Sequence, residues 1–123
     1  MYYVSKRMEI SAAHCLSLSY DSPCNGEHGH NWIITVHCKA SALNDDGMVI
    51  DFAQIKTAIH GQLDHTFLNE SLDCSNPTSE YIAKWVCDQI DSCYKVEVQE
   101  SEGNIAVYEV DEDTDEDTAD ASN

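Results

Sequence analysis

Chemically active side chains concentrate in residues 24–30 of this 123-residue chain. The segment reads Cys-Asn-Gly-Glu-His-Gly-His and holds a thiol, a carboxylate and two imidazoles. Residues two apart share a face of a β-strand, so an extended segment would project His28 and His30 in the same direction. Two imidazoles that point the same way form half of a metal site. A third imidazole, His14, ends another alternating segment upstream.

Antiparallel pairing of residues 2–14 with residues 30–40 would complete this site. The end of the first segment would then lie beside the start of the second, which brings His14 within reach of the other two imidazoles. Three neutral imidazoles are the ligand set of a catalytic zinc ion, which keeps a fourth position open for water or substrate. Taken alone, two histidines at this spacing also occur by chance in cores and on surfaces. A four-cysteine zinc site is disfavoured because the six cysteines include no Cys-x-x-Cys pair.

Three further groups could take part in proton transfer or ligand binding. Cys24 lies in a Pro-Cys-Asn-Gly turn, where its thiol could approach a substrate bound to the metal. Asp64 precedes His65, and a carboxylate can fix the tautomer of an imidazole, although adjacent residues need not touch. Glu100 ends an extended segment. It is either an exposed carboxylate or a buried one that grips a guanidine-like ligand edge through two hydrogen bonds.

The elements that must hold these groups begin with two strands and a helix. Alternation of apolar and polar residues predicts strands over residues 2–14 and 30–40, with a loop over 15–29 between them. Asp51 stands where an N-cap belongs, and apolar side chains follow it at helical spacing. We therefore expect a helix that ends near residue 64.

A second helix and a hairpin complete the predicted domain. Residues 76–80 read Asn-Pro-Thr-Ser-Glu, which places a proline and a carboxylate at the start of a helix. Residues 94–99 and 105–110 read as two strands around a Ser-Glu-Gly-Asn turn. This order predicts a single α+β domain over residues 1–110, in which one antiparallel sheet carries both helices on one face.

The composition predicts a soluble cytoplasmic protein with reduced thiols. No apolar segment approaches the length of a membrane span, and no apolar run follows the amino-terminal charges. The net charge of −17 disfavours nucleic acid as a partner, because its phosphates would be repelled. Residues 111–123 hold seven of the 23 acidic residues and no large apolar side chain, which predicts a disordered tail. The tail could bind a partner or increase solubility.

These motifs together resemble the 6-pyruvoyl-tetrahydropterin synthase superfamily over residues 3 to about 110. The resemblance is carried by short motifs in a fitting order: Ala-Ala-His at 12–14, Cys-Asn-Gly-Glu-His-Gly-His-Asn at 24–31, Gly-Met-Val-Ile-Asp-Phe at 47–52, Leu-Asp-His at 63–65, Leu-Asn at 68–69, Asn-Pro-Thr-Ser-Glu at 76–80 and Val-Gln-Glu at 98–100. Residues 76–90 are most similar to the bacterial branch, the 6-carboxy-tetrahydropterin synthases of queuosine biosynthesis.

The resemblance implies a tunnelling fold, which is a four-stranded antiparallel sheet with two helices on one face. Subunits with this fold join their sheets into a trimeric barrel, and two barrels stack. We therefore expect a homohexamer, a dimer of trimers, with active sites between subunits. The expected partners are a small pterin substrate and further copies of the chain, with no nucleic acid and no membrane.

The resemblance also implies roles for individual residues. The zinc ligands would be His14, His28 and His30. Cys24 would accept a proton, and Asp64 with His65 would form a second acid/base group that reaches the site from a neighbouring subunit. Glu100 would anchor the 2-amino-4-oxo edge of the pterin. Further lining would come from Thr78, Ser79 and Glu80.

The implied reaction converts 7,8-dihydroneopterin triphosphate into 6-carboxy-5,6,7,8-tetrahydropterin with release of acetaldehyde and triphosphate. Zinc would acidify the side-chain hydroxyls of the substrate, while Cys24 and His65 move protons on either side. Glu27 departs from the family pattern, in which this position is usually apolar. We interpret it as a second proton acceptor or a partner of a zinc-binding histidine, with a solvated carboxylate as the alternative.

Two other functions stay open at this point. Glu27 is compatible with 6-pyruvoyl-tetrahydropterin synthesis or with another cleavage of a neopterin side chain. From a different class, the chain could be a non-catalytic pterin-binding or assembly module. The full set of Cys24, Asp64, His65 and Glu100 counts against the module, since an idle relative would be free to lose these residues.

Overall fold

Two long strands form the centre of the computed structural model, which describes residues 1–111. β1 (Tyr2–His14) and β2 (His28–Ala40) pair antiparallel along their whole length, with His14 opposite His28. The predicted pairing of these segments is confirmed, and β2 begins two residues earlier than predicted. This longer ladder includes both His28 and His30, so their shared face follows from strand geometry.

The sheet has five strands in the order β3-β1-β2-β4-β5. β4 (Cys93–Ser101) and β5 (Asn104–Glu109) form the predicted hairpin, and β4 pairs antiparallel with β2. β3 (Thr66–Phe67) runs parallel to β1 beside Ala12 and Ala13. The prediction of a four-stranded, purely antiparallel sheet is therefore wrong: the sheet is mixed. A two-residue strand is too short to produce a periodic signal, and it forms only because the preceding helix returns the chain to the edge of β1.

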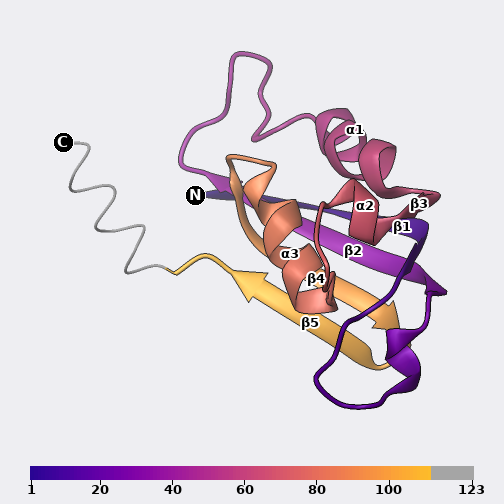
Figure 1. The fold of residues 1–123 in the computed structure, drawn as a ribbon. Coiled ribbons are helices and arrows are strands. Elements are labelled where there is room, and N and C mark those ends of the chain that lie inside the picture. Colours follow the sequence, from indigo (N-terminus) through magenta and orange to yellow (C-terminus); the bar gives the residue numbers. More distant parts are fainter. Residues whose placement is uncertain (112–123) are drawn as a thin grey trace.

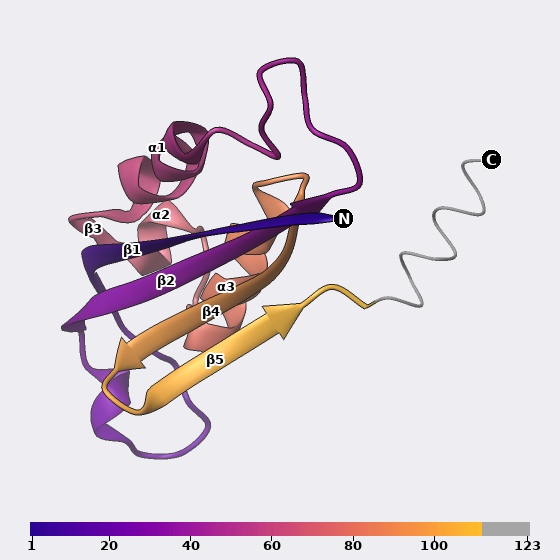
Figure 2. The same cartoon turned by 180° about the vertical axis from the view of Figure 1, so that it is seen from behind.

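Helices cover one face of this sheet, and the opposite face carries none within residues 1–111 (Figures 1 and 2). α1 (Phe52–Leu63) is capped by Asp51, whose side chain accepts a hydrogen bond from the Ala53 N–H, as predicted. α3 (Ser79–Asp88) begins after Thr78, whose side chain accepts from the Tyr81 N–H. The sequence did not predict two short elements, α2 (Leu68–Ser71) and the 3₁₀ turn η1 (Pro23–Asn25).

The hydrophobic core lies between the helices and the covered face of the sheet. Buried side chains come from alternate residues of the strands and from one stripe of each long helix. The largest fully buried apolar side chains include Ile10, Trp32, Ile34, Val36, Ile55, Ile59, Leu63, Leu68, Ile82, Val86 and Val96. His14 continues the buried parity of β1, so the candidate metal site lies at the end of this core.

Two predictions concern regions or properties away from this core. The predicted acidic tail, residues 111–123, lies outside the described residues except for Asp111. Within residues 1–111, no helix is both long enough and apolar enough to span a bilayer.

Candidate active site

Three histidines and one glutamate converge at the end of the β1–β2 ladder. The register places His14 opposite His28 and Ala12 opposite His30, so all three imidazoles project from the covered face of the sheet. One ligand atom from each of His14, His28, His30 and Glu100 lies within 4.8 Å of the others. The structure thus brings together the three histidines that the sequence pattern selected, and adds Glu100 to them.

The hydrogen bonds of His14 and His28 determine which ring nitrogen faces the centre of this cluster. His14 Nδ1 lies 2.9 Å from the Pro77 carbonyl oxygen, and His28 Nδ1 lies 2.7 Å from the Gly26 carbonyl oxygen. A carbonyl oxygen can only accept a hydrogen bond, so Nδ1 carries the proton in both rings. The two Nε2 atoms face each other at 3.0 Å, and in neutral rings each presents a lone pair. Only a shared proton or a cation removes this repulsion.

Burial disfavours a proton at this position, whereas a metal ion would be coordinated by all three imidazoles. The His14 side chain is fully buried. Burial lowers the pKa of His14, and the neighbouring imidazoles of His28 and His30 act in the same direction, although the Pro77 carbonyl and Glu100 oppose them. A neutral imidazole whose Nδ1–H is held by a backbone carbonyl is the usual form of a metal-binding histidine. The donor set therefore fits zinc.

His30 and Glu100 complete the cluster. His30 Nε2 is buried and has no hydrogen-bond partner among residues 1–111, although Glu100 Oε1 lies 3.3 Å away. The Ser79 hydroxyl donates a hydrogen bond of 3.3 Å to Glu100 Oε2, which orients the carboxylate. Glu100 can therefore either approach a metal through Oε1 or hold a ligand beside it. The sequence indicated only the second role, because a strand-end residue gives no sign of its neighbour across the sheet.

Trp32 forms an apolar floor beneath the histidines. Its ring is fully buried and lies edge-on to His14 and His30, with centroid distances of 4.9 and 5.1 Å. The indole N–H donates a 3.0 Å hydrogen bond to the Ala12 carbonyl oxygen. This packing holds the His14 and His30 rings from one side. The alternation in the sequence predicted only a core position for Trp32.

Cys24 lies in η1 and is held through its backbone. Its N–H donates to the Ser22 hydroxyl at 3.2 Å, and its carbonyl oxygen accepts from the Leu16 N–H at 3.1 Å. The thiol is half-buried and does not belong to the group of four metal-binding atoms. Glu27 is exposed directly before β2. Glu27 directly precedes His28 in the chain. Within residues 1–111, no hydrogen bond joins its carboxylate to the histidine cluster.

Asp64 and His65 lie at the other edge of β1. Asp64 Oδ1 accepts a 2.8 Å hydrogen bond from the Ser11 N–H, and its Oδ2 lies 3.3 Å from His65 Nε2. His65 has a positive φ of 61° and an 81% exposed side chain. The Asp64–His65 pair is thus in contact, as an acid/base pair requires.

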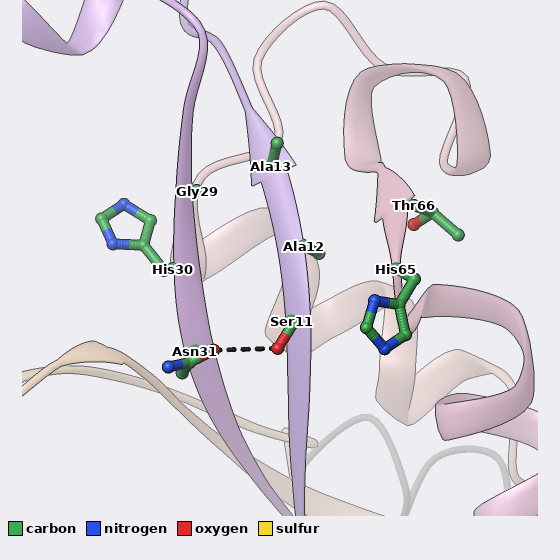
Figure 3. A pocket seen from close by; sticks show the side chains of 8 residues that line it. All are labelled: Ser11, Ala12, Ala13, Gly29, His30, Asn31, His65 and Thr66. Atoms are coloured by element: carbon green, nitrogen blue, oxygen red, sulfur yellow. Dashed lines mark hydrogen bonds between the residues drawn. The ribbon is translucent and has the colours of Figure 1, made fainter.

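A depression of about 450 Å³ lies between this pair and His30 of the same chain. Both His65 and His30 line it, together with Ser11, Asn31 and Thr66. The Ser11 hydroxyl donates a 2.8 Å hydrogen bond to Asn31 (Figure 3). Ser11 and Asn31 have the strand parity opposite to that of the cluster. Figure 3 shows the rings of His65 and His30 on opposite sides of the two strands. Within residues 1–111, no hydrogen bond or ion pair joins Asp64 or His65 to the three histidines.

The start of α3 contributes unequally to the site. Ser79 contacts Glu100, and Thr78 caps the helix. Glu80 is exposed on the surface of α3, beside a different depression. The backbone carbonyl of Pro77 holds His14 from 63 residues away, and no spacing in the sequence could reveal this contact.

Comparison with known proteins identifies the family. The family described as "6-pyruvoyl tetrahydropterin synthase" matches residues 3–112. A Bacillus subtilis protein named 6-carboxy-5,6,7,8-tetrahydropterin synthase is 30% identical, with 87% of this chain and 84% of the relative aligned. The Homo sapiens 6-pyruvoyl tetrahydrobiopterin synthase is 32% identical, with 85% and 89% aligned. The solved structure of Caenorhabditis elegans 6-pyruvoyl tetrahydropterin synthase is similar with a TM-score of 0.71 at 25% identity, and covers 89% of this chain and 96% of that one. These matches confirm the resemblance in the motifs: the chain belongs to the 6-pyruvoyl tetrahydropterin synthase family.

Proposed function

We propose that this protein is a zinc-dependent carbon–carbon lyase. It converts 7,8-dihydroneopterin triphosphate and water into 6-carboxy-5,6,7,8-tetrahydropterin, acetaldehyde and triphosphate. Family membership and the name of the Bacillus subtilis relative support this reaction. The single observation that carries the proposal is the pair of Nε2 atoms of His14 and His28, which face each other at 3.0 Å while both Nδ1 atoms are held by carbonyl oxygens.

The histidines would hold the metal beside the substrate side chain, and Glu100 would bind the pterin ring. His14, His28 and His30 hold the zinc ion, which when bound acts as a Lewis acid toward the hydroxyl groups of the substrate side chain. Glu100 accepts hydrogen bonds from the 2-amino-4-oxo edge of the pterin, and the Ser79 hydroxyl fixes the direction of its carboxylate. A locally positive site is needed because residues 1–110 carry 16 acidic and six basic side chains.

Proton transfer would use groups from two subunits. Cys24 accepts a proton on one side of the substrate, and His65 exchanges protons on the other side while Asp64 holds its ring. Because the rings of His65 and His30 lie on opposite sides of the two strands, we assign Asp64 and His65 to the site of a neighbouring subunit. This assignment is part of the proposed homohexamer, a dimer of trimers, in which each site needs two chains.

The experiment that tests the function is product analysis with a matched pair of histidine variants. Protein stripped of metal by chelation and protein reloaded with zinc are incubated with 7,8-dihydroneopterin triphosphate, and the products are identified by mass spectrometry. We expect 6-carboxy-5,6,7,8-tetrahydropterin and acetaldehyde only from the zinc-loaded protein. His30→Ala should abolish this turnover, whereas His37→Ala, which removes a histidine from the opposite face, should keep it.

The same experiment separates the alternatives. A 6-pyruvoyl product would assign a different reaction to the same site. The 32% identity to the human 6-pyruvoyl tetrahydrobiopterin synthase is the reason to test for this product. Loss of activity in Glu27→Gln would assign Glu27 to proton transfer, and unchanged activity would leave it a solvated carboxylate. Absence of any product from zinc-loaded protein would refute the lyase and favour a non-catalytic pterin-binding module.

A further inference from the structure

The segment that follows β1 is held from both sides although it belongs to no regular strand. On one side, two asparagine side chains clamp its backbone. Asn69 accepts a hydrogen bond of 2.9 Å from the Cys15 N–H and donates one of 2.9 Å to the Cys15 carbonyl oxygen. Asn76 accepts one of 2.6 Å from the Ser17 N–H and donates one of 3.3 Å to the Ser17 carbonyl oxygen. A carboxamide carries an accepting oxygen beside a donating NH2 group, so each asparagine imitates the C=O and N–H of a residue in a neighbouring strand.

On its other side the same segment holds the turn that contains Cys24. The Leu16 N–H donates to the Cys24 carbonyl oxygen at 3.1 Å, and the Leu18 N–H donates to Asn25 Oδ1 at 3.2 Å. Odd residues of the segment therefore bond to the asparagines, and even residues bond to the Cys24 turn. This alternation is that of a β-strand between two neighbours. The position of the Cys24 turn therefore depends on residues 15–18, which the two asparagines hold.

The asparagines are themselves fixed by the part of the chain that supports the rest of the site. Asn69 lies in α2, and Asn76 precedes Pro77, whose carbonyl oxygen holds His14. Ser79, three residues after Asn76, orients Glu100. The connection from α2 to α3 thus contacts the metal cluster, the ligand-anchoring carboxylate and the support of the Cys24 turn. Because one short connection contacts all three groups, it links their relative positions.

We propose that Asn69 and Asn76 are positioning residues that hold Cys24 in register with the metal cluster. The inference rests on the proposed role of Cys24 in catalysis. Neither carboxamide needs to touch substrate, because each acts through the backbone of residues 15–18. Their loss should therefore slow the chemical step and leave substrate binding and zinc binding in place, since His14, His28 and His30 remain held by the β1–β2 ladder.

The test compares kcat, KM and zinc content for Asn69→Ala and Asn76→Ala. We expect kcat to fall by about 10- to 100-fold in each, the range for a small displacement of a reacting group, while KM and zinc content stay within about threefold. Asn76→Asp keeps the acceptor for the Ser17 N–H and should lie between Asn76→Ala and the wild type. Gln89→Ala is the matched control: it removes a carboxamide that donates to the Trp85 carbonyl oxygen on the surface of α3, and it should leave kcat unchanged.

A second readout does not depend on turnover. Hydrogen exchange of the peptide that covers residues 15–25 should be faster in both alanine variants, whereas peptides from the β1–β2 ladder should exchange as in the wild type. Unchanged exchange over 15–25 would refute the clamp. Unchanged kcat, or a loss of kcat that follows a loss of zinc or a matching rise in KM, would refute the positioning role. If the wild type turns over no pterin, the proposed function fails, and the exchange experiment still decides whether the clamp exists.

Discussion

Zinc should raise the thermal stability of this protein, and a single histidine should decide whether it does. The four candidate ligand atoms lie within 4.8 Å of one another in the folded chain, so binding needs no rearrangement of the backbone. In the unfolded chain, His14 and His28 are separated by 14 residues and do not form the site. Zinc binding free energy is therefore available to the folded state and largely unavailable to the unfolded state.

The expected magnitude follows from this linkage. Free zinc at 100 times the dissociation constant stabilises the fold by about 2.7 kcal/mol. For a folded part of about this size, each kcal/mol raises the melting temperature by about 4 °C, so the melting temperature should rise by about 10 °C. The assay is thermal unfolding of chelator-stripped protein at increasing zinc concentrations, monitored by circular dichroism. Bound zinc is measured separately, and we expect one zinc ion per chain.

Two variants make this prediction refutable. His30→Ala removes one of three imidazoles from the cluster and should reduce the zinc-dependent rise to less than about 3 °C. His37→Ala removes an imidazole that lies on the opposite face and contacts Glu97 at 2.7 Å, and it should keep the full rise. An equal rise in both variants would show that zinc binds elsewhere, for example to exposed carboxylates, and would refute the site.

Two other predictions concern the carboxylates. Ser79→Ala should raise the dissociation constant for a pterin by about 2- to 10-fold with little change in kcat, because it removes one hydrogen bond worth about 0.5–1.5 kcal/mol that orients Glu100. Fluorescence titration measures the dissociation constant, and an unchanged value would contradict this role of Ser79. The hydrogen bond from the Ser11 N–H holds the pKa of Asp64 below its ordinary value, with smaller contributions from neighbouring histidines, so this carboxylate stabilises the fold above the ordinary carboxyl pKa and loses that contribution as pH falls through its folded pKa. Urea unfolding of Asp64→Asn and wild type should therefore give stabilities that differ at pH 6 and converge only once the pH falls below the folded pKa of Asp64, which itself lies below the ordinary carboxyl value of about 4. A constant difference would show that the ionised carboxylate contributes nothing.

Much of the candidate site could be predicted from local patterns. The parity of His28 and His30 in one strand and the alternation up to His14 depend on neighbours along the chain, and a long antiparallel pairing then leaves little choice of register. The helix cap Asp51 was likewise predicted locally, because its side chain bonds an N–H two residues away. Thr78 was not predicted as a cap, although its bond to the Tyr81 N–H is equally local. The motifs around these residues are also specific enough to indicate the family.

The sequence alone therefore determined which side chains could bind a metal and on which face of the sheet they project. Only the tertiary structure decided which ring nitrogen of His14 carries the proton, because the Pro77 carbonyl bonds it from 63 residues away. The structure likewise brought Asn76 to Ser17 across 59 residues, in the segment that holds the Cys24 turn. It also added the parallel strand β3 to the sheet and placed the rings of His65 and His30 on opposite sides of the two strands. These contacts depend on how α2 packs against β1 and how α3 packs against β4 and β5. That packing is set by the whole hydrophobic core, and no short stretch of sequence contains it.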